Sequence, residues 1–234
     1  MKLLFVTGGS RGLGAALCAH YLDSGWEVKE FSRAAPFPFS FHVDFADPAF
    51  ASQRLMQALA PAAGLEVEEA IAVGNAAMLG PVGPVERSSP AEIAAHYNVN
   101  VVSATLFACL FFAVFQENAC PKTFVNISSG AGSRGLAGWS LYCASKAAMD
   151  NYVRAVALEQ EARTYPIRAI SIDPVVMDTE MQAEVRSALP DEFPDVEHYV
   201  RLHEEGRLGD PKQVAARIAK LIESRPASGG VYRV

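Results

Sequence analysis

Tyr142 and Lys146 stand four residues apart, a spacing that places both side chains on one face of a helix. A free tyrosine, with a pKa near 10, exchanges protons poorly at neutral pH, but a neighbouring ammonium stabilises its phenolate. Ser129 precedes Tyr142 by thirteen residues and offers a hydroxyl that can hydrogen-bond a carbonyl oxygen. A Tyr–Lys pair at this spacing is common by chance, so the surrounding residues decide whether it indicates catalysis. With Ser129, the pair predicts proton exchange with a carbonyl substrate.

A glycine-rich turn lies between the first predicted strand and the first predicted helix. It contains Thr7, Gly8, Gly9, Ser10, Arg11, Gly12, Leu13 and Gly14. Glycines let the backbone approach a pyrophosphate closely, and the positive end of the helix that follows attracts the phosphate charge. The turn therefore predicts a dinucleotide site at the N-terminal end of the chain.

The residue type at the end of the second predicted strand bears on the choice between NAD and NADP. An NAD site usually places Asp or Glu there for the ribose hydroxyls, but this chain has Arg33, and Arg11 lies in the glycine turn. Two guanidinium groups favour a 2′-phosphate, and no carboxylate repels it. We therefore expect NADP(H) as the cofactor; the alternative is that both arginines are ordinary surface residues.

Short apolar runs alternate with longer helical patterns and must position these groups. We predict strands at residues 2–7, 27–32, 39–44, 69–74, 122–128, 167–173 and 230–234. We predict helices at residues 11–24, 48–59, 90–115, 141–163, 179–188 and 211–224. The segment 34–40 is too short for a crossover helix and contains Pro36 and Pro38, so we expect a loop there. The alternation predicts an α/β, Rossmann-type doubly wound, seven-stranded parallel sheet with helices on both faces, in a single domain over residues 1–234.

Composition excludes several classes of protein. The net charge of −6 argues against a nucleic-acid surface, which needs clustered lysines and arginines. The apolar segment 99–115 is shorter than the roughly 20 residues of a membrane span, and we expect a helix covered by the sheet and by a second subunit. The four cysteines lack CxxC spacing and the N-terminal apolar run is shorter than a signal-peptide core, so we expect a cytoplasmic protein with reduced thiols. The histidines form no pattern of metal ligands.

The ordered set of glycine turn, Asn75, Asn100, Ser129, Tyr142 and Lys146 resembles the short-chain dehydrogenase/reductase family along essentially the whole chain. The resemblance implies a catalytic tetrad of Asn100, Ser129, Tyr142 and Lys146. In the family, Lys146 also holds the nicotinamide ribose, and Asn100 holds a water that relays protons to it. The implied cofactor-binding residues are Gly8, Ser10, Arg11, Gly12, Leu13, Gly14, Arg33, Asp44, Phe45, Asn75, Ala76, Ile127, Tyr142, Lys146, Pro174, Met177 and Thr179.

Two positions depart from the family pattern. Ala77 replaces the last glycine of the Asn-Asn-Ala-Gly motif, and Val175 replaces the glycine that follows Pro174. Neither change removes a catalytic group. We expect Val175 to narrow the pocket near the nicotinamide and to reduce turnover.

Within the family, residues 138–143 and 178–182 look like the sepiapterin reductases and the bacterial benzil reductases. Sepiapterin reductases anchor the pterin through an acidic residue in the last strand, but residues 228–234 contain none. The resemblance therefore favours NADPH-dependent reduction of an aromatic ketone or 1,2-diketone. The expected substrate-binding residues are Ser129, Leu136, Trp139, Tyr142, Met181, Val185 and Phe193, although ordinary core packing explains each apolar one equally well.

Three alternatives or further expectations remain. The first alternative is a sepiapterin-type pterin reductase, and the second is a non-catalytic NADP-binding sensor on the same fold. A sensor has no need for a placed Ser129 and Tyr142, which argues against it. The resemblance also implies a homodimer or homotetramer, because the apolar helix and the Tyr142 helix form subunit contacts in this family.

Overall fold

Strands with apolar side chains on both faces build one parallel sheet in the computed structural model, which describes residues 1–234. The strands are β1 (Lys2–Thr7), β2 (Glu27–Ser32), β3 (Ser40–His42), β4 (Glu69–Gly74), β5 (Lys122–Ile127), β6 (Arg168–Asp173) and β7 (Val231–Arg233). Their order is β3-β2-β1-β4-β5-β6-β7, and every neighbouring pair is parallel. All six residues of β5 are buried, as expected of a central strand covered on both faces. The predicted seven-stranded Rossmann-type fold is confirmed.

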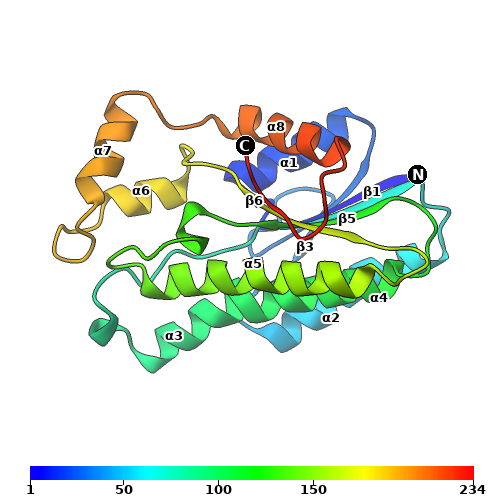
Figure 1. Ribbon diagram of the computed structural model, residues 1–234, viewed down its shortest axis with the longest axis horizontal. Helices are drawn as coiled ribbons and strands as arrows, with labels where there is room; N and C mark the ends of the chain where they lie inside the picture. Colours follow the sequence, from blue (N-terminus) through cyan, green and yellow to red (C-terminus); the bar gives the residue numbers. More distant parts are fainter.

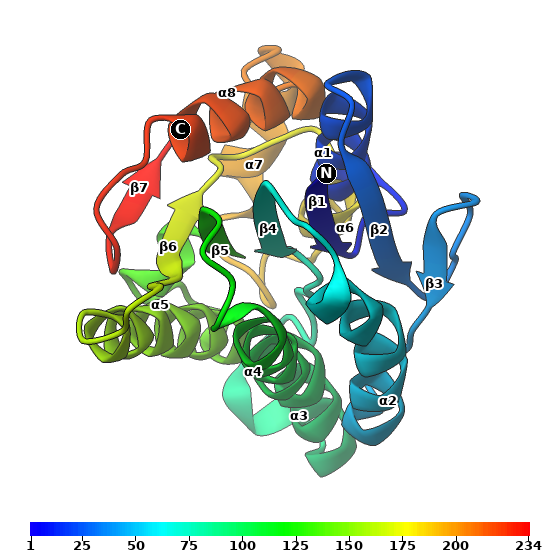
Figure 2. The same cartoon turned by 90° about the vertical axis from the view of Figure 1, so that its right-hand side faces the viewer.

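Helices cover both faces of the sheet (Figure 2). One face carries α1 (Gly12–Asp23) and α8 (Pro211–Glu223), and the other carries α2 (Pro48–Leu59), α4 (Ala104–Phe115) and α5 (Ser140–Gln160). The helix α3 (Pro90–Tyr97) leads into α4 and contacts α5. Two further helices, α6 (Glu180–Arg186) and α7 (Val196–Glu204), stand beyond one end of the sheet (Figure 1).

Local capping residues define where several helices begin. Asp47 accepts a hydrogen bond from the Phe50 backbone N–H at the start of α2, and Ser89 forms a reciprocal capping box with Glu92 at the start of α3. Each of these helices has proline at its first position, where a missing N–H costs nothing. The predicted starts at residues 48, 90 and 211 therefore match the structure.

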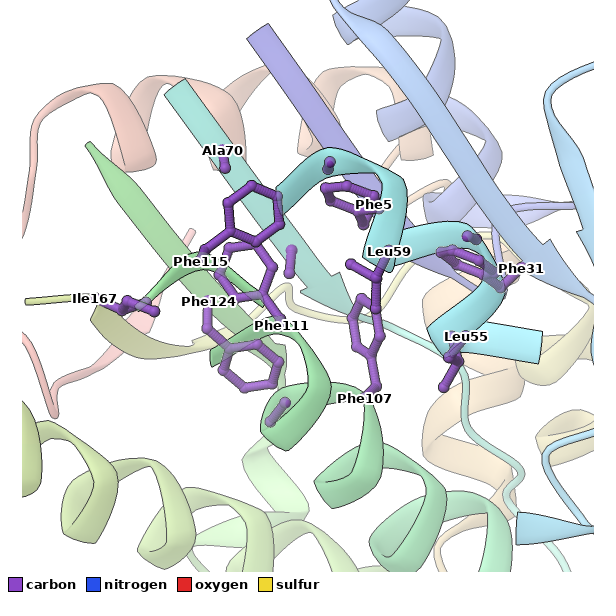
Figure 3. Close-up of a cluster of buried hydrophobic side chains, with 14 of the residues drawn as sticks. Phe5, Phe31, Leu55, Leu59, Ala70, Phe107, Phe111, Phe115, Phe124 and Ile167 are labelled. Atoms are coloured by element: carbon purple, nitrogen blue, oxygen red, sulfur yellow. The ribbon is translucent and has the colours of Figure 1, made fainter. Parts of the chain in front are cut away.

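A cluster of phenylalanines fills the layer between the sheet and α2 and α4 (Figure 3). Phe107, Phe111 and Phe115 project from α4 and pack against Phe5 of β1 and Phe124 of β5. All five rings are at most 1% exposed. This core fixes α4 on the sheet and thereby the helical segment before it.

The long helix predicted at residues 90–115 is interrupted by a π-helical segment, Asn98–Ser103, between α3 and α4. The apolar segment 99–115 is part of a longer continuous helical stretch, Pro90–Phe115, which has 26 residues and contains an 18-residue window with a mean hydropathy of 1.9. By length and composition it could cross a membrane, but its phenylalanine face packs into the core of the sheet layer. The opposite face includes Val102, which is 41% exposed.

Three other elements differ from the predictions. Helix α7 was not predicted, and β3 and β7 are shorter than expected, with three residues each. The loop predicted between β2 and β3 is present, since residues 33–39 contain no helix. The buried residues of α7 are Val196, Tyr199 and Leu202, a three-residue spacing that indicates a helix but spans too few turns to stand out from the sequence.

The order of the strands creates a crevice at one place. From β1 the chain winds outward through β2 to β3, and it then returns to place β4 on the other side of β1. Ligands of doubly wound sheets bind at such a switch point, beyond the carboxyl ends of the strands. The glycine turn follows β1 and Asn75 follows β4, so both lie at this point.

Candidate active site

A cavity of about 790 Å³ opens along the carboxyl ends of β1, β2, β4, β5 and β6. Helices α6 and α7 stand beyond this end of the sheet (Figure 1). The cavity runs from the glycine turn to Tyr142. Most of the predicted site residues line it: Gly8, Ser10, Arg11, Gly12, Leu13, Arg33, Asp44, Phe45, Asn75, Ala76, Ile127, Ser129, Trp139, Tyr142, Lys146, Pro174, Met177, Thr179, Met181 and Val185. Four do not line it: Gly14, Asn100, Leu136 and Phe193.

The glycine turn is held against the loop after β4. The Thr7 hydroxyl accepts hydrogen bonds from the backbone N–H groups of Asn75 and Ala76, both at 3.0 Å. The Asn75 amide donates to the carbonyl oxygens of Thr7 and Gly8, at 3.0 and 2.9 Å. A Cβ atom on Gly14 would lie 2.2 Å from the Gly8 carbonyl oxygen, so a side chain cannot fit there. Gly14 therefore shapes the turn from within instead of facing the cavity.

The two arginines of the predicted ribose end differ in their contacts. Arg33 is exposed at the end of β2 and forms no ion pair, so its guanidinium is free to meet a phosphate. Arg11 pairs with Glu180, the first residue of α6, and their side chains are 66% and 67% exposed. An exposed pair of this kind is weak and can open. Asp44 also lines the cavity, where its carboxylate accepts from the Ala46 backbone N–H at 2.9 Å.

Tyr142, Ser129 and Lys146 meet at the deep end of the cavity. The Ser129 hydroxyl hydrogen-bonds the Tyr142 phenol oxygen, and the Lys146 Nζ lies 5.6 Å from the centre of the Tyr142 ring. Both Tyr142 and Lys146 are less than 10% exposed. The predicted spacing on α5 thus brings the tyrosine and the lysine to one face of the helix, beside Ser129, which lies two residues after the end of β5.

Burial dominates the ionisation of this pair. It raises the pKa of Tyr142 to about 12, although the Ser129 hydrogen bond works in the opposite direction. It also lowers the pKa of Lys146 to about 8, against the attraction of the Asp150 carboxylate. The Lys146 Nζ donates to the Ile127 carbonyl oxygen at 2.7 Å. Our expectation was that Lys146, together with the positive nicotinamide of the oxidised complex, draws the Tyr142 pKa down. The protein groups alone do not produce this shift, because desolvation of the buried phenol dominates.

Asn100 lies in the π-helical segment and supports the site from behind. Its side chain accepts from the Met78 N–H and donates to the Met78 carbonyl oxygen, both at 2.8 Å. It also lies 3.1 Å from the His96 Nε2 and donates to the Ser145 hydroxyl at 3.2 Å. The His96 Nδ1 contacts the Gly80 carbonyl oxygen at 2.7 Å, and burial lowers the His96 pKa, which favours the neutral ring. The Asn100 side-chain amide thus forms its hydrogen bonds with protein groups. Asn100 does not line the cavity, whereas its partner Met78 does.

The predicted apolar wall is only partly in contact with the cavity. Trp139, Met181 and Val185 line it, whereas Phe193 is fully buried behind Trp139. Tyr199 of α7 was not predicted but lines the same end, and its ring centre lies 5.6 Å from that of Trp139. The three-residue spacing of buried residues in α7 is a weak helical signal, and it does not indicate that Tyr199 reaches the cavity.

Val175 adopts an unusual backbone conformation beside the cavity. Its φ of +61° lies in the left-handed region, where a β-branched side chain is strained. The family glycine at this position has no such restriction. Val175 lines the cavity, as does Ala77, so both departures from the family pattern border the site.

No cluster of three or more His, Cys, Asp or Glu side chains that could hold a metal ion occurs in the structure. The fit of a dinucleotide can be judged from the protein groups alone. The turn between Gly8 and Gly12 has positive φ angles of 67° and 53° and precedes α1, so its backbone N–H groups stand at a helix N-terminus. The residues present therefore fit a nicotinamide dinucleotide along the cavity.

Comparisons with known proteins agree with this geometry. Residues 2–190 match the sequence profile of the family described as short chain dehydrogenase. The benzil reductase ((S)-benzoin forming) of Bacillus subtilis (strain 168) is 34% identical over 239 residues, covering 100% of this chain and 98% of that protein. The sepiapterin reductase of Bos taurus is 28% identical over 170 residues, covering 71% of this chain and 61% of that protein.

A solved structure shows the same arrangement over its whole length. The crystal structure of the KRED1-Pglu enzyme has a TM-score of 0.84 to this chain at 26% sequence identity, covering 99% of this chain and 100% of that one. The similarity therefore includes the helices that surround the cavity as well as the sheet.

Proposed function

Because this chain belongs to the short-chain dehydrogenase family, we propose that it is an NADPH-dependent reductase of an aromatic ketone or 1,2-diketone. The observation that carries the proposal is the meeting of Ser129, Tyr142 and Lys146 at the deep end of a cavity that begins at the glycine turn. A carbonyl oxygen that reaches Tyr142 meets two hydroxyl groups and a nearby ammonium. This arrangement suits reduction of a carbonyl to an alcohol.

NADP is the proposed form of the cofactor. Arg33 is exposed and free of ion pairs at the end of β2, and no acidic residue stands in its place. Arg11 can join it when its exposed pair with Glu180 opens. Two guanidinium groups at this end support binding of a 2′-phosphate, with which guanidinium forms charge-assisted hydrogen bonds.

Tyr142 and the residues around it have separate roles in proton transfer to the carbonyl oxygen. The Ser129 hydroxyl holds the carbonyl oxygen beside the Tyr142 phenol. Tyr142 donates its proton to that oxygen as negative charge develops there, and the Lys146 ammonium stabilises the phenolate that remains. When bound, the reduced nicotinamide supplies the hydride to the carbonyl carbon. The alcohol thus gains one hydrogen from each source.

The substrate end of the cavity supports an aromatic compound. Trp139, Tyr199, Met181 and Val185 present mainly apolar surface beside Tyr142. The relative from Bacillus subtilis is named for reduction of benzil, an aromatic 1,2-diketone. No acidic residue occurs in residues 228–234, where a pterin anchor would be expected. A pterin is therefore the second candidate, supported by the match to sepiapterin reductase.

The experiment that tests this function follows the loss of NADPH absorbance with a panel of aromatic ketones, 1,2-diketones and pterins. We expect turnover with the diketones, faster with NADPH than with NADH. Turnover with pterins alone would contradict the substrate assignment. Tight NADPH binding without oxidation by any carbonyl would contradict the enzyme assignment and favour a cofactor sensor.

We propose further that the protein acts as a cytoplasmic homodimer or homotetramer. Val102 on the helical stretch before α4 is 41% exposed and Leu158 on α5 is 66% exposed, and such surfaces favour association. The four cysteines are free thiols, in keeping with a reducing compartment. Light scattering after size-exclusion chromatography tests the assembly, and a monomer at all concentrations would contradict it.

A further inference from the structure

A buried carboxylate lies one helical turn beyond the catalytic lysine. Asp150 follows Lys146 by four residues on α5 and is 4% exposed. Its two carboxylate oxygens accept from different donors: the Ser128 hydroxyl at 2.8 Å and the Asn126 amide at 3.3 Å. Carboxylates are rarely buried to this degree unless other groups compensate the charge. The burial of Asp150 therefore indicates a role other than packing in the core.

Lys146 and Asp150 hold the same short segment. The Lys146 Nζ donates to the Ile127 carbonyl oxygen at 2.7 Å, between the two residues that Asp150 binds. Hydrogen bonds thus join three consecutive residues, the last two of β5 and Ser128, to one face of α5. The next residue is Ser129, whose hydroxyl meets Tyr142.

The turn after Ser129 closes directly over this carboxylate. A Cβ atom on Gly132 would lie 2.7 Å from an Asp150 carboxylate oxygen and 3.3 Å from the Ser128 hydroxyl oxygen. The backbone at Gly132 and the side chain of Ser128 therefore confine the Asp150 carboxylate from two sides. Its position cannot change without moving the loop that carries Ser129.

The charges near Lys146 make Asp150 its principal electrostatic partner. On α5 itself the ionisable neighbours are Tyr142, Cys143 and Asp150. Only the Asp150 charge works against the burial that lowers the Lys146 pKa to about 8. His96 of α3 also lies near, but burial lowers the pKa of its ring and favours the neutral form. Asp173 of β6 raises the pKa of Tyr142 through its negative charge. A buried ammonium with a single opposite charge depends strongly on that charge.

We propose that Asp150 is a positioning residue with two tasks: its carboxylate keeps the Lys146 ammonium charged, and its hydrogen bonds fix the segment that ends in Ser129. The carboxylate touches neither substrate nor cofactor. This inference rests on the proposed function, because it assigns Lys146 and Ser129 their parts in carbonyl reduction.

The test compares Asp150→Asn with the parent protein. Asparagine keeps the shape and one acceptor oxygen but removes the charge, so the pKa of Lys146 falls. The alkaline limb of the kcat profile for reduction is expected to move down by about one pH unit, because an opposite charge at close range shifts a pKa by one or more units. Relative to the parent, the rate falls about tenfold at pH 9 and less than about twofold at pH 6.

The matched variant is Ser128→Ala, which removes one hydrogen bond of Asp150 but leaves its charge. We expect a lower kcat at every pH with the alkaline limb unmoved. A pH profile of Asp150→Asn that superimposes on the parental one would overturn the charge role. A Ser128→Ala enzyme with the parental kcat would overturn the positioning role. Asp150→Ser is also uncharged but smaller, and we expect the same shift of the alkaline limb. It replaces Asp150→Asn in the test if the asparagine variant does not fold.

A titration without substrate separates this inference from the proposed function. The Lys146 Cε resonance, assigned through Lys146→Arg, reports the lysine pKa directly by NMR. We expect that pKa to be lower in Asp150→Asn by about one unit even if no carbonyl compound is reduced. An unchanged lysine titration would refute the inference, whereas absent turnover with a shifted titration would refute only the proposed function.

Discussion

The indole of Trp139 lies flat on the ring of Phe193, with ring centres 4.4 Å apart and planes 3° apart. Trp139 faces the cavity, and Phe193 stands behind it with no exposed surface. The cavity wall at this end is therefore one layer of side chains held by a second. Phe193 lies in the loop between α6 and α7, seven residues after Arg186 and three before Val196, so this stack also anchors that loop.

Phe193→Leu tests this support. Loss of the stacked ring at roughly conserved volume should lower the free energy of unfolding by about 1 kcal/mol and let Trp139 move. We expect the KM for the carbonyl substrate to rise while the KM for NADPH stays constant, measured by steady-state kinetics. Phe37→Leu is the matched control, because Phe37 stacks on Phe39 with centres 5.0 Å apart outside the cavity. An equal rise in carbonyl KM for both variants would refute the prediction.

Tyr142→Phe should reduce the rate of carbonyl reduction by about 10²- to 10⁴-fold, because the proton donor is removed. The dissociation constant of NADPH, measured by fluorescence titration, should remain close to the parental value. Tyr152→Phe removes a hydroxyl from the same helix, where it lies 3.6 Å from the Cys109 Sγ, and should retain the parental rate. Unchanged turnover of Tyr142→Phe would exclude the proposed proton donor.

Arg33→Ala should weaken NADPH binding by about ten- to a hundredfold, which corresponds to the loss of hydrogen bonds to a charged phosphate. NADH binding should change little, because NADH lacks the 2′-phosphate. Calorimetric titration of both cofactors measures the difference. Arg217→Ala removes an exposed arginine from α8, outside the cavity, and should leave both affinities unchanged. Equal losses for the two cofactors would contradict a phosphate contact.

Val175→Gly should raise the free energy of unfolding by about 1 kcal/mol, because glycine adopts the φ of +61° without strain. Thermal and urea unfolding measure this change. The neighbouring Val176 has no positive φ and packs against buried side chains, so Val176→Gly should destabilise the protein. If Val175→Gly is also destabilising, packing of the valine outweighs its backbone strain. We also expect faster turnover in Val175→Gly, since the side chain borders the cavity.

The buried lysine predicts a pH dependence of stability. Its pKa is about 8 in the folded protein and about 10.4 in an unfolded chain, so between these values the unfolded chain binds more protons. Stability therefore rises with pH across this window, and below about pH 8 this contribution levels off because the lysine is protonated in both states. Lys146→Met should remove this contribution, which the difference between the two urea-unfolding profiles isolates. Parallel profiles from pH 7 to pH 10.5 would contradict a lowered lysine pKa.

Several features of the site could be predicted because they depend on short stretches of chain. The four-residue spacing of Tyr142 and Lys146 places them on one face of any helix. The glycine turn after an apolar strand and before a helix is likewise a local pattern. Prolines with capping residues determined where α2 and α3 begin. These signals, together with the alternation of strands and helices, were sufficient for the fold.

Contacts between distant segments required the tertiary structure. Tyr199 enters the cavity wall because α7 folds back toward Trp139, and Phe193 leaves that wall because Trp139 covers it. The pairing of Arg11 with Glu180 joins residues far apart in the chain. Packing of separate elements decides which of several apolar or charged side chains meet, and no local pattern contains that choice.

The sequence by itself therefore determined the parallel sheet, through the alternation of strands and helices along the chain. It also determined the glycine turn and the shared helix face of Tyr142 and Lys146, since both follow from backbone geometry within a few residues. Only the tertiary structure showed that Asp150 lies under Ser128 and beside Lys146, and that burial raises the Tyr142 pKa while it lowers that of Lys146. Desolvation depends on everything that surrounds a group, and those surroundings come from every layer of the fold.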